Sequence, residues 1–341
     1  LEQQPTYQKV IVKPQTTLAL LTVALTLVAA GCRPVDSPAP AASAITKVRL
    51  PMGYIANVQY APYYVAVERG YFREEGIEVE FDYKFETDGV KLVAAGELPF
   101  AVVSGEQVVL ARAQGLPVKY VAQWYHQFPI AVIALESSGI RTPQDLKGRT
   151  VGLPGFFGAT YVGWRAFLNA NGLSESDVTV LEIGFTQVAA LQQGNVDAVV
   201  GYAVNEPIVL TENGYPVVVF KVADQVDMVA NGIVTSDRIA KDNPDLVRGF
   251  VRALLRGVED TIQDPDAAME IAVKYVEGLK ADDPVQRAVL LDTVEILKPG
   301  PKKPGESTPE AWRNTQDTLL AMGQVKEAAD INTFFTNEFL P

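Results

Sequence analysis

Residues 48–81, VRLPMGYIANVQYAPYYVAVERGYFREEGIEVEF, decide the fold class of this chain. Val48 to Tyr54 is predicted to be a strand, 56–63 an aromatic loop, Tyr64 to Arg69 a helix, and 76–81 a second strand with alternating apolar and charged residues. In open α/β sheets, ligands bind outside the carboxyl ends of the strands. The loop, rich in Tyr, Asn and Gln, is therefore a candidate binding segment for a flat neutral molecule, whereas Tyr64 is equally suited to pack the helix on the sheet.

Alternating strands and helices continue along the chain and indicate a doubly wound α/β architecture. Start signals for helices are Thr142-Pro143 and a capping box formed by Ser104 and Gln107. Strands are predicted at 46–54, 77–83, 99–103, 118–124, 129–135, 149–153, 178–182, 196–200, 216–220 and 229–234. Later residues are predicted to form helices at 244–263, 266–279, 283–297 and 309–322. We expect a two-lobed fold with a helical C-terminal segment, with lobe 1 comprising 46–126 plus 226–341 and lobe 2 comprising 127–225.

Composition excludes one class of partner. The 341 residues carry a net charge of −12, and no cluster of Lys and Arg stands out. Nucleic-acid binding needs basic patches that displace counterions, so no nucleic-acid partner is expected. The length and the 48% hydrophobic content suit a globular protein of about two domains.

The first residues resemble an export signal. Lys9 and Lys13 precede an uncharged apolar run at 18–30, which has the length of a signal-peptide core and is short for a membrane span. The run ends at Cys32, the only cysteine of the chain, in a context similar to a bacterial lipobox. We expect a signal peptide at 1–31, lipidation of Cys32, a flexible tether at 32–45, and a protein anchored on the extracytoplasmic face of the cell membrane. The alternative is a plain secretory signal.

Candidate ligand-binding residues follow the predicted strand ends, which should face one crevice. Their rings could stack on a flat ligand, and almost no basic residue accompanies them, which favours a neutral heteroaromatic solute over an anion. Plainer readings remain: half of the rings as core, both Phe side chains of the 155–158 turn as core, the carboxylates as helix-start residues, and the serine as a cap. Of the two Phe rings in this turn, we expect one in the core and one at the ligand. The candidates are Asn57, Gln59, Tyr60, Tyr63, Asp88, Ser104, Trp124, Tyr125, Phe156, Phe157, Thr160, Tyr161, Tyr202, Asn205 and Glu206.

No residue is predicted to be catalytic, and no cofactor or metal site is expected. His126 is the only histidine and is interpreted as a structural residue near a hinge. No metal-ligand spacing appears, and with Cys32 acylated the folded part would have no thiol for catalysis.

Several motifs resemble the type 2 periplasmic-binding-protein superfamily, in particular its thiamine-pyrimidine-synthase-like branch. They are found at 57–66, 68–72, 76–79, 145–152 and 193–198. Bacterial members of this branch are solute-binding lipoproteins of ABC importers, and the chain is most similar to the riboflavin-binding group. The resemblance implies two lobes closing on riboflavin or a related heteroaromatic molecule, with an ABC permease and its ATPase as partners.

Three further possibilities remain open: a thiamine pyrimidine precursor as the ligand, a pyrimidine-synthase-like enzyme, and an adhesive or scaffolding lipoprotein. The fungal relatives of the branch consume their own histidine and carry a cysteine-rich iron motif. The resemblance places Tyr60 at the position of that histidine, and this chain has no cysteine beyond Cys32. The enzyme hypothesis is therefore poorly supported by the sequence.

Overall fold

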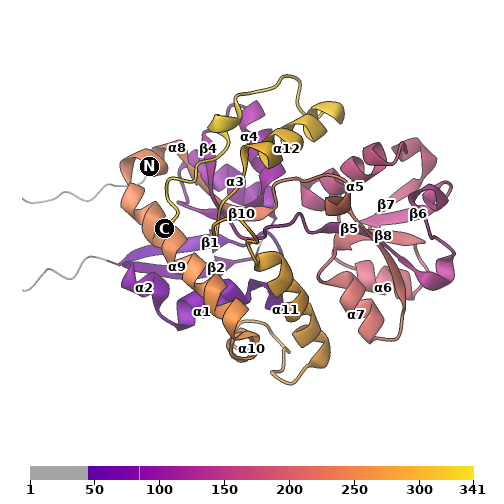
Figure 1. The fold of residues 1–341 in the computed structure, drawn as a ribbon, viewed down its shortest axis with the longest axis horizontal. Helices are drawn as coiled ribbons and strands as arrows, with labels where there is room; N and C mark the ends of the chain where they lie inside the picture. Colours follow the sequence, from indigo (N-terminus) through magenta and orange to yellow (C-terminus); the bar gives the residue numbers. More distant parts are fainter. Residues whose placement is uncertain (1–44, 84) are drawn as a thin grey trace, which may run out of the picture. The chain divides into compact units, whose positions relative to one another are not determined.

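A computed structural model of the chain, drawn in Figure 1, describes residues 45–83 and 85–341. The expected signal peptide, the lipidation site at Cys32 and nearly all of the expected tether lie outside these residues.

The strands predicted from alternating and apolar runs are all present, with ends that differ by a few residues. Short apolar runs bounded by Gly, Pro and polar residues are what marks a buried strand. The strands are β1 (Thr46–Pro51), β2 (Ile77–Asp82), β3 (Ala101–Ser104), β4 (Val118–Gln123), β5 (Ile130–Leu135), β6 (Thr150–Leu153), β7 (Thr179–Glu182), β8 (Ala198–Tyr202), β9 (Val217–Lys221) and β10 (Asn231–Ser236).

These strands form three groups. β1 and β2 pair in parallel, and β10 pairs antiparallel with both β3 and β4. The larger sheet has the order β7-β6-β8-β5-β9, in which β6 runs parallel to its neighbours and β5 antiparallel to its own. β10 thus follows the five-stranded sheet in the chain but returns to strands that precede it. On this pairing we propose that 46–126 with 226–341 form one lobe and 127–225 the other.

Helices connect and cover these sheets, and α5, α6 and α7 lie around the five-stranded sheet in Figure 1. The helical C-terminal segment is confirmed, although its second helix ends earlier than predicted. The helices are α1 (Ala61–Glu68), α2 (Tyr71–Glu74), α3 (Glu86–Ala95), α4 (Gly105–Ala113), α5 (Gly158–Ala170), α6 (Gln187–Gln192), α7 (Glu206–Glu212), α8 (Asp237–Asp242), α9 (Pro244–Gln263), α10 (Pro265–Ala272), α11 (Pro284–Leu297) and α12 (Pro309–Ala321).

Helix α9 packs closely against α1. Its apolar stripe, which includes Val247, Phe250 and Leu254, is buried in the core. Gly257 lies at the contact, where a Cβ atom would stand 2.2 Å from the carbonyl oxygen of Pro62. The absence of a side chain at Gly257 therefore sets the distance between the two helices.

The aromatic segment 56–63 is more ordered than predicted. A short 3₁₀ turn, Val58–Tyr60, leads directly into α1, which starts at Ala61 because Pro62 is well tolerated in a first helical turn. This earlier start places Tyr63 in the helix. Both Tyr63 and Tyr64 are fully buried, so packing is the correct interpretation for Tyr64.

One of the two predicted helix caps is wrong. Thr142 forms a capping box with Asp145 ahead of Pro143, as expected, although the element it starts is a 3₁₀ helix. Ser104 precedes α4 but makes no capping hydrogen bond. Its hydroxyl instead contacts the carboxyl groups of Glu86, which is half-buried, and Glu106, which is buried.

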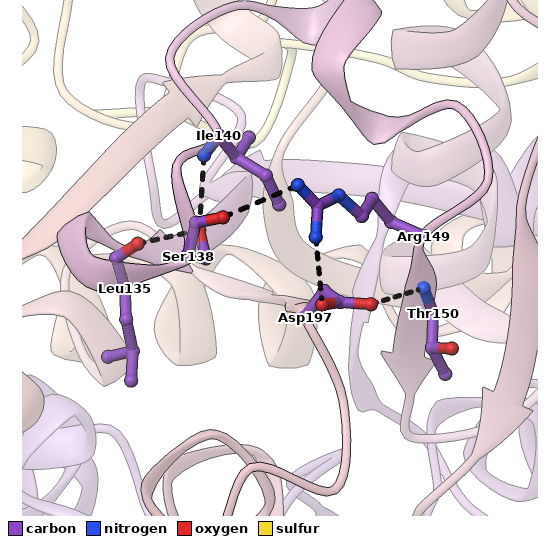
Figure 2. Close-up of polar contacts among 6 residues, drawn as sticks. All are labelled: Leu135, Ser138, Ile140, Arg149, Thr150 and Asp197. Atoms are coloured by element: carbon purple, nitrogen blue, oxygen red, sulfur yellow. Dashed lines mark hydrogen bonds and ion pairs between the residues drawn. The ribbon is translucent and has the colours of Figure 1, made fainter.

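The motifs at 145–152 and 193–198 meet at the starts of β6 and β8, as Figure 2 shows. One carboxylate oxygen of Asp197 accepts from the Thr150 backbone N–H at 2.8 Å, and the other lies 3.4 Å from the Arg149 guanidinium. Arg149 also donates to the carbonyl oxygen of Ser138 at 3.4 Å. These contacts hold two parallel strands in register at the ends where they begin. These motif residues are therefore structural.

Candidate ligand pocket

A pocket lies at the opposite ends of these strands, where β1, β4, β6 and β8 run out. It is bordered by the first residues of α3, α5, α6 and α7 and by the start of β10. Its cavity volume is about 70 Å³. The lining residues are Gly53, Tyr54, Gln59, Tyr60, Phe85, Glu86, Thr87, Trp124, Tyr125, Pro154, Phe157, Gly158, Ala159, Thr160, Phe185, Gln187, Tyr202, Asn205, Glu206 and Asn231.

Three rings at the back of the pocket stack on one another. The Trp124 ring lies 5.3 Å from Tyr60 and 3.9 Å from Tyr125, centroid to centroid, with both pairs stacked. The Tyr60 hydroxyl donates to the carbonyl oxygen of Met52 at 2.6 Å. Because Trp124 is sandwiched, its faces are already used, and it can offer a ligand only an edge.

A second group of rings borders the pocket at the protein surface. Phe85, Phe157 and Phe185 are 43%, 41% and 37% exposed. Phe85 stands edge-on to Phe157 at 5.2 Å and tilted to Phe185 at 5.6 Å, while Tyr54 stands edge-on to Phe185 at 4.7 Å. We call these four residues the mouth rings. A planar ligand larger than the present interior would have to displace them, and it could then stack on the faces they expose.

Polar groups from three distant segments form a hydrogen-bonded cluster, of which Glu86 and Asn231 line the pocket. Glu86 accepts from the Ser104 backbone N–H at 3.1 Å, from its hydroxyl at 2.6 Å, and from the Asn231 amide at 2.8 Å. The Ser104 hydroxyl also contacts Glu106. Burial raises the pKa of Glu86 and of Glu106 above the ordinary carboxyl range. We call Glu86, Ser104, Glu106 and Asn231 the polar wall.

Glu206, at the start of α7, is a second buried carboxyl in the pocket lining. Its carboxylate accepts from the Tyr202 backbone N–H at 2.7 Å. Burial raises the pKa of Glu206 to about 7. Among the described residues lining the pocket, none is Lys, Arg or His. The described walls therefore suit an uncharged, hydrogen-bonding ring system better than an anion.

The pocket brings together many of the residues proposed from the sequence as ligand contacts: Gln59, Tyr60, Trp124, Tyr125, Phe157, Thr160, Tyr202, Asn205 and Glu206. It does not include Asn57, Tyr63, Asp88, Ser104, Phe156 or Tyr161.

These omissions have local causes. The Asn57 side chain accepts from the Gln59 backbone N–H, and Tyr63 is buried edge-on to Trp124. Phe156 is 50% exposed and stands edge-on to Tyr161 at 6.0 Å. The expectation that one Phe of this turn enters the core is therefore wrong, because both rings are partly exposed.

Sequence reasoning missed several lining residues. The sequence predicts Asp88 as the ligand contact in the segment after β2, but Glu86 lines the pocket instead. The signal that could have found it is Gly53: its backbone φ is +82°, and a Cβ atom there would lie 2.7 Å from the Glu86 side chain. Asn231 begins β10 and carried no sequence signal. Phe85 and Phe185 fall in connections whose direction depends on the fold.

His126 lies next to the pocket but does not line it. Its imidazole Nε2 accepts from the Gly305 backbone N–H at 3.4 Å, and burial lowers its pKa to about 4. These contacts are consistent with the structural role predicted for it.

Comparison with known proteins gives the family. Residues 57–268 match the model of the NMT1/THI5 like family. The chain is also 42% identical to the riboflavin-binding protein RibY of Chloroflexus aurantiacus over 90% of each protein. The chain therefore belongs to the NMT1/THI5 like family.

Other relatives have different names. The formylaminopyrimidine-binding protein of Halalkalibacterium halodurans is 28% identical, covering 82% of this chain and 86% of that protein. The 4-amino-5-hydroxymethyl-2-methylpyrimidine phosphate synthase of Legionella pneumophila is 26% identical, covering 87% and 93%. The relatives of this chain thus include proteins named as binders and proteins named as enzymes.

The fold is that of periplasmic binding proteins. The alkanesulfonate-binding protein SsuA from Xanthomonas axonopodis superposes with a TM-score of 0.68 at 16% identity, covering 87% of this chain and all of that one. The predicted α/β periplasmic-binding-protein fold is therefore confirmed. Within residues 45–83 and 85–341, no helix is both long and apolar enough to cross a membrane.

Proposed function

We propose that this protein is the solute-binding component of an ABC importer and captures riboflavin without transforming it. The observation that carries the proposal is the match to the riboflavin-binding protein RibY across 90% of both chains. The pocket adds independent support, because rings and uncharged polar groups dominate its described lining. An ABC permease and its ATPase would receive the ligand from it.

Riboflavin is favoured over a thiamine pyrimidine precursor because of the mouth rings. The stack of Tyr60, Trp124 and Tyr125 is internally satisfied, which removes most of its faces from the rings available to a ligand. The mouth rings remain, and several partly exposed rings offer more surface than a single pyrimidine covers. The 28% identity to a formylaminopyrimidine-binding protein keeps the smaller ligand as the second candidate.

The test is a titration of riboflavin monitored by quenching of flavin fluorescence. Saturable quenching at micromolar or lower concentration, with unchanged riboflavin recovered and identified by mass spectrometry, is the expected result. If riboflavin gave no quenching while an aminopyrimidine raised the melting temperature, the order of the two ligands would be reversed. Conversion of the recovered ligand would instead favour the enzymes of the family.

We also propose that the protein is exported and held on the extracytoplasmic face of the cell membrane by lipid on Cys32. The supporting observation is the Lys-flanked apolar run that ends at this single cysteine. Cys32→Ser should release the protein from the membrane fraction and change its processing. Membrane association and processing identical to those of the unaltered protein would overturn the assignment.

A further inference from the structure

Asn231 has one end of its side chain engaged and the other free. Its Nδ2 group donates to Glu86 at 2.8 Å and to the Tyr202 hydroxyl at 3.3 Å. Its Oδ1 atom is buried and has no hydrogen-bond partner among the described residues. The residue is 4% exposed and lines the pocket. An acceptor in this position needs a donor, because leaving it unpaired carries the full cost of its lost hydration.

The backbone of Asn231 is also fixed. Its carbonyl oxygen accepts from the Trp124 N–H at 2.8 Å and from the Tyr125 N–H at 3.1 Å. The backbone that carries the free Oδ1 atom is therefore held by Trp124 and Tyr125, which also belong to the ring stack at the back of the pocket. Such support by a second layer of contacts is what gives a binding group a defined direction.

Glu86 determines which end of the Asn231 amide is free. Its other carboxylate oxygen is occupied by the two Ser104 donors, so the remaining oxygen faces Asn231. An ionised carboxylate only accepts hydrogen bonds, and the amide must therefore turn its NH₂ group toward it. The oxygen of Asn231 is then left for the pocket.

Counting protons and donors indicates which of the two carboxyls is ionised. The single hydroxyl proton of Ser104 cannot serve both Glu86 and Glu106, so the two carboxyls together hold at least one further proton. Glu86 accepts from three donors of Ser104 and Asn231, whereas Glu106 accepts from the Gln107 amide at 3.1 Å and from its own backbone N–H. Burial raises the pKa of Glu86 to about 8, so its ionised form depends on the donors around it. Because Glu86 has more donors than Glu106, we infer that the shared proton rests on Glu106, which donates to Ser104, which in turn donates to Glu86.

Two donors in the same pocket also lack partners. They are the side-chain Nε2 of Gln59, 5% exposed, and the indole N–H of Trp124, 3% exposed. Both residues line the pocket. The unmatched groups thus consist of one acceptor and two donors. A complementary ligand would offer one donor and two acceptors.

We propose that Asn231 is the specificity-determining residue of the pocket, and that its Oδ1 atom accepts a hydrogen bond from the ring N–H of a cyclic imide. This inference rests on the proposed function and refines it. The pyrimidinedione edge of riboflavin is such an imide, with one N–H between two carbonyls. An aminopyrimidine has no ring N–H, so only its exocyclic amino group could donate to Asn231.

The experiment compares two flavins in the wild-type protein and two variants. Riboflavin and 3-methylriboflavin differ only at the imide nitrogen, where a methyl group replaces the proton. Wild-type protein should bind the methylated flavin at least about tenfold more weakly, since a site built around a hydrogen bond rejects the analogue that lacks it. Asn231→Ala should lower the affinity for riboflavin and bring the ratio of the affinities for the two flavins to near one.

Glu86→Gln is the second variant and keeps the shape of the side chain. Its carbonyl should remain on the Ser104 donors, so its NH₂ group would face Asn231 and turn that amide around. A donor would then meet the imide N–H. The affinity for riboflavin should fall by at least about tenfold, while the affinity for 3-methylriboflavin should change little. The ratio of the two affinities therefore again falls toward one.

The outcomes separate this inference from the proposed function. Equal affinity of the wild type for the two flavins, or a ratio that survives in both variants, would overturn the role of Asn231 and leave riboflavin binding intact. A wild type that binds an aminopyrimidine and neither flavin would overturn both. A general weakening of both flavins in a variant, with the ratio kept, would mark a structural role only and would also overturn the assignment.

Discussion

The buried carboxyl of Glu206 should make the stability of the ligand-free protein fall as the pH rises. Its pKa is about 7 in the folded protein against an ordinary value of 4.5. Between these two values the folded protein holds a proton that the unfolded chain has released. Stability from this group is fully present below the ordinary value and is lost as the pH rises through about 7.

The size of the effect follows from the two pKa values. Over the whole interval the linkage relation gives about 3 kcal/mol, and between about pH 5.5 and about pH 8 it gives about 2 kcal/mol. Glu206→Gln removes the titration but keeps a carbonyl oxygen that can accept from the Tyr202 N–H. The variant should therefore gain about 2 kcal/mol relative to wild type across that range.

Urea unfolding at a series of pH values measures this difference. The difference in the free energy of unfolding between wild type and variant removes the contribution of His126. The lowered pKa of His126, about 4, makes stability rise with pH in the same range. Glu212→Gln, at the exposed end of the same helix, is the matched control and should follow the wild-type curve. A difference in the free energy of unfolding between Glu206→Gln and wild type that stays the same at every pH would refute the reasoning.

Three further changes test the pocket and the packing. Phe157→Ala should weaken riboflavin by at least about tenfold, or about 1.4 kcal/mol, in a fluorescence titration, while Phe156→Ala, outside the pocket, should not. Gly257→Ala should lower the free energy of unfolding by about 1–3 kcal/mol, since its Cβ would overlap a carbonyl of α1. Asp197→Ala should cost about 1–3 kcal/mol by leaving a backbone N–H without its acceptor, with riboflavin affinity unchanged in the folded protein. Urea unfolding measures the last two.

The strands and the long C-terminal helices could be predicted because their signals are local. An apolar run flanked by Gly or Pro marks a buried strand wherever it pairs, and the stripe through Phe250 and Leu254 marks one face of a helix. The cap at Thr142 is equally local, since its partner lies three residues away. The cap at Ser104 failed because its hydroxyl has a competing acceptor in Glu86, eighteen residues earlier in the chain.

The pocket could be predicted only in part, for a geometric reason. Strand ends locate the segments that border it, which is why the 202–206 and 157–160 segments were found. Which ring of a segment faces the pocket depends on where the next helix begins. Tyr63 lies in α1, not in a loop, because α1 begins earlier than predicted. Glu86 and Asp88 both lie in the first turn of α3, so the sequence does not distinguish which of them faces the pocket.

The polar wall could not have been read from the sequence at all. Glu86 and Asn231 are 145 residues apart, and each alone resembles an ordinary residue at the start of a helix or strand. They acquire a role only when folding brings them together. A buried carboxylate needs donors, and the amide that supplies one must turn its oxygen the opposite way. The direction of the Asn231 amide is therefore a consequence of satisfying Glu86, and the ligand preference we infer follows from that requirement.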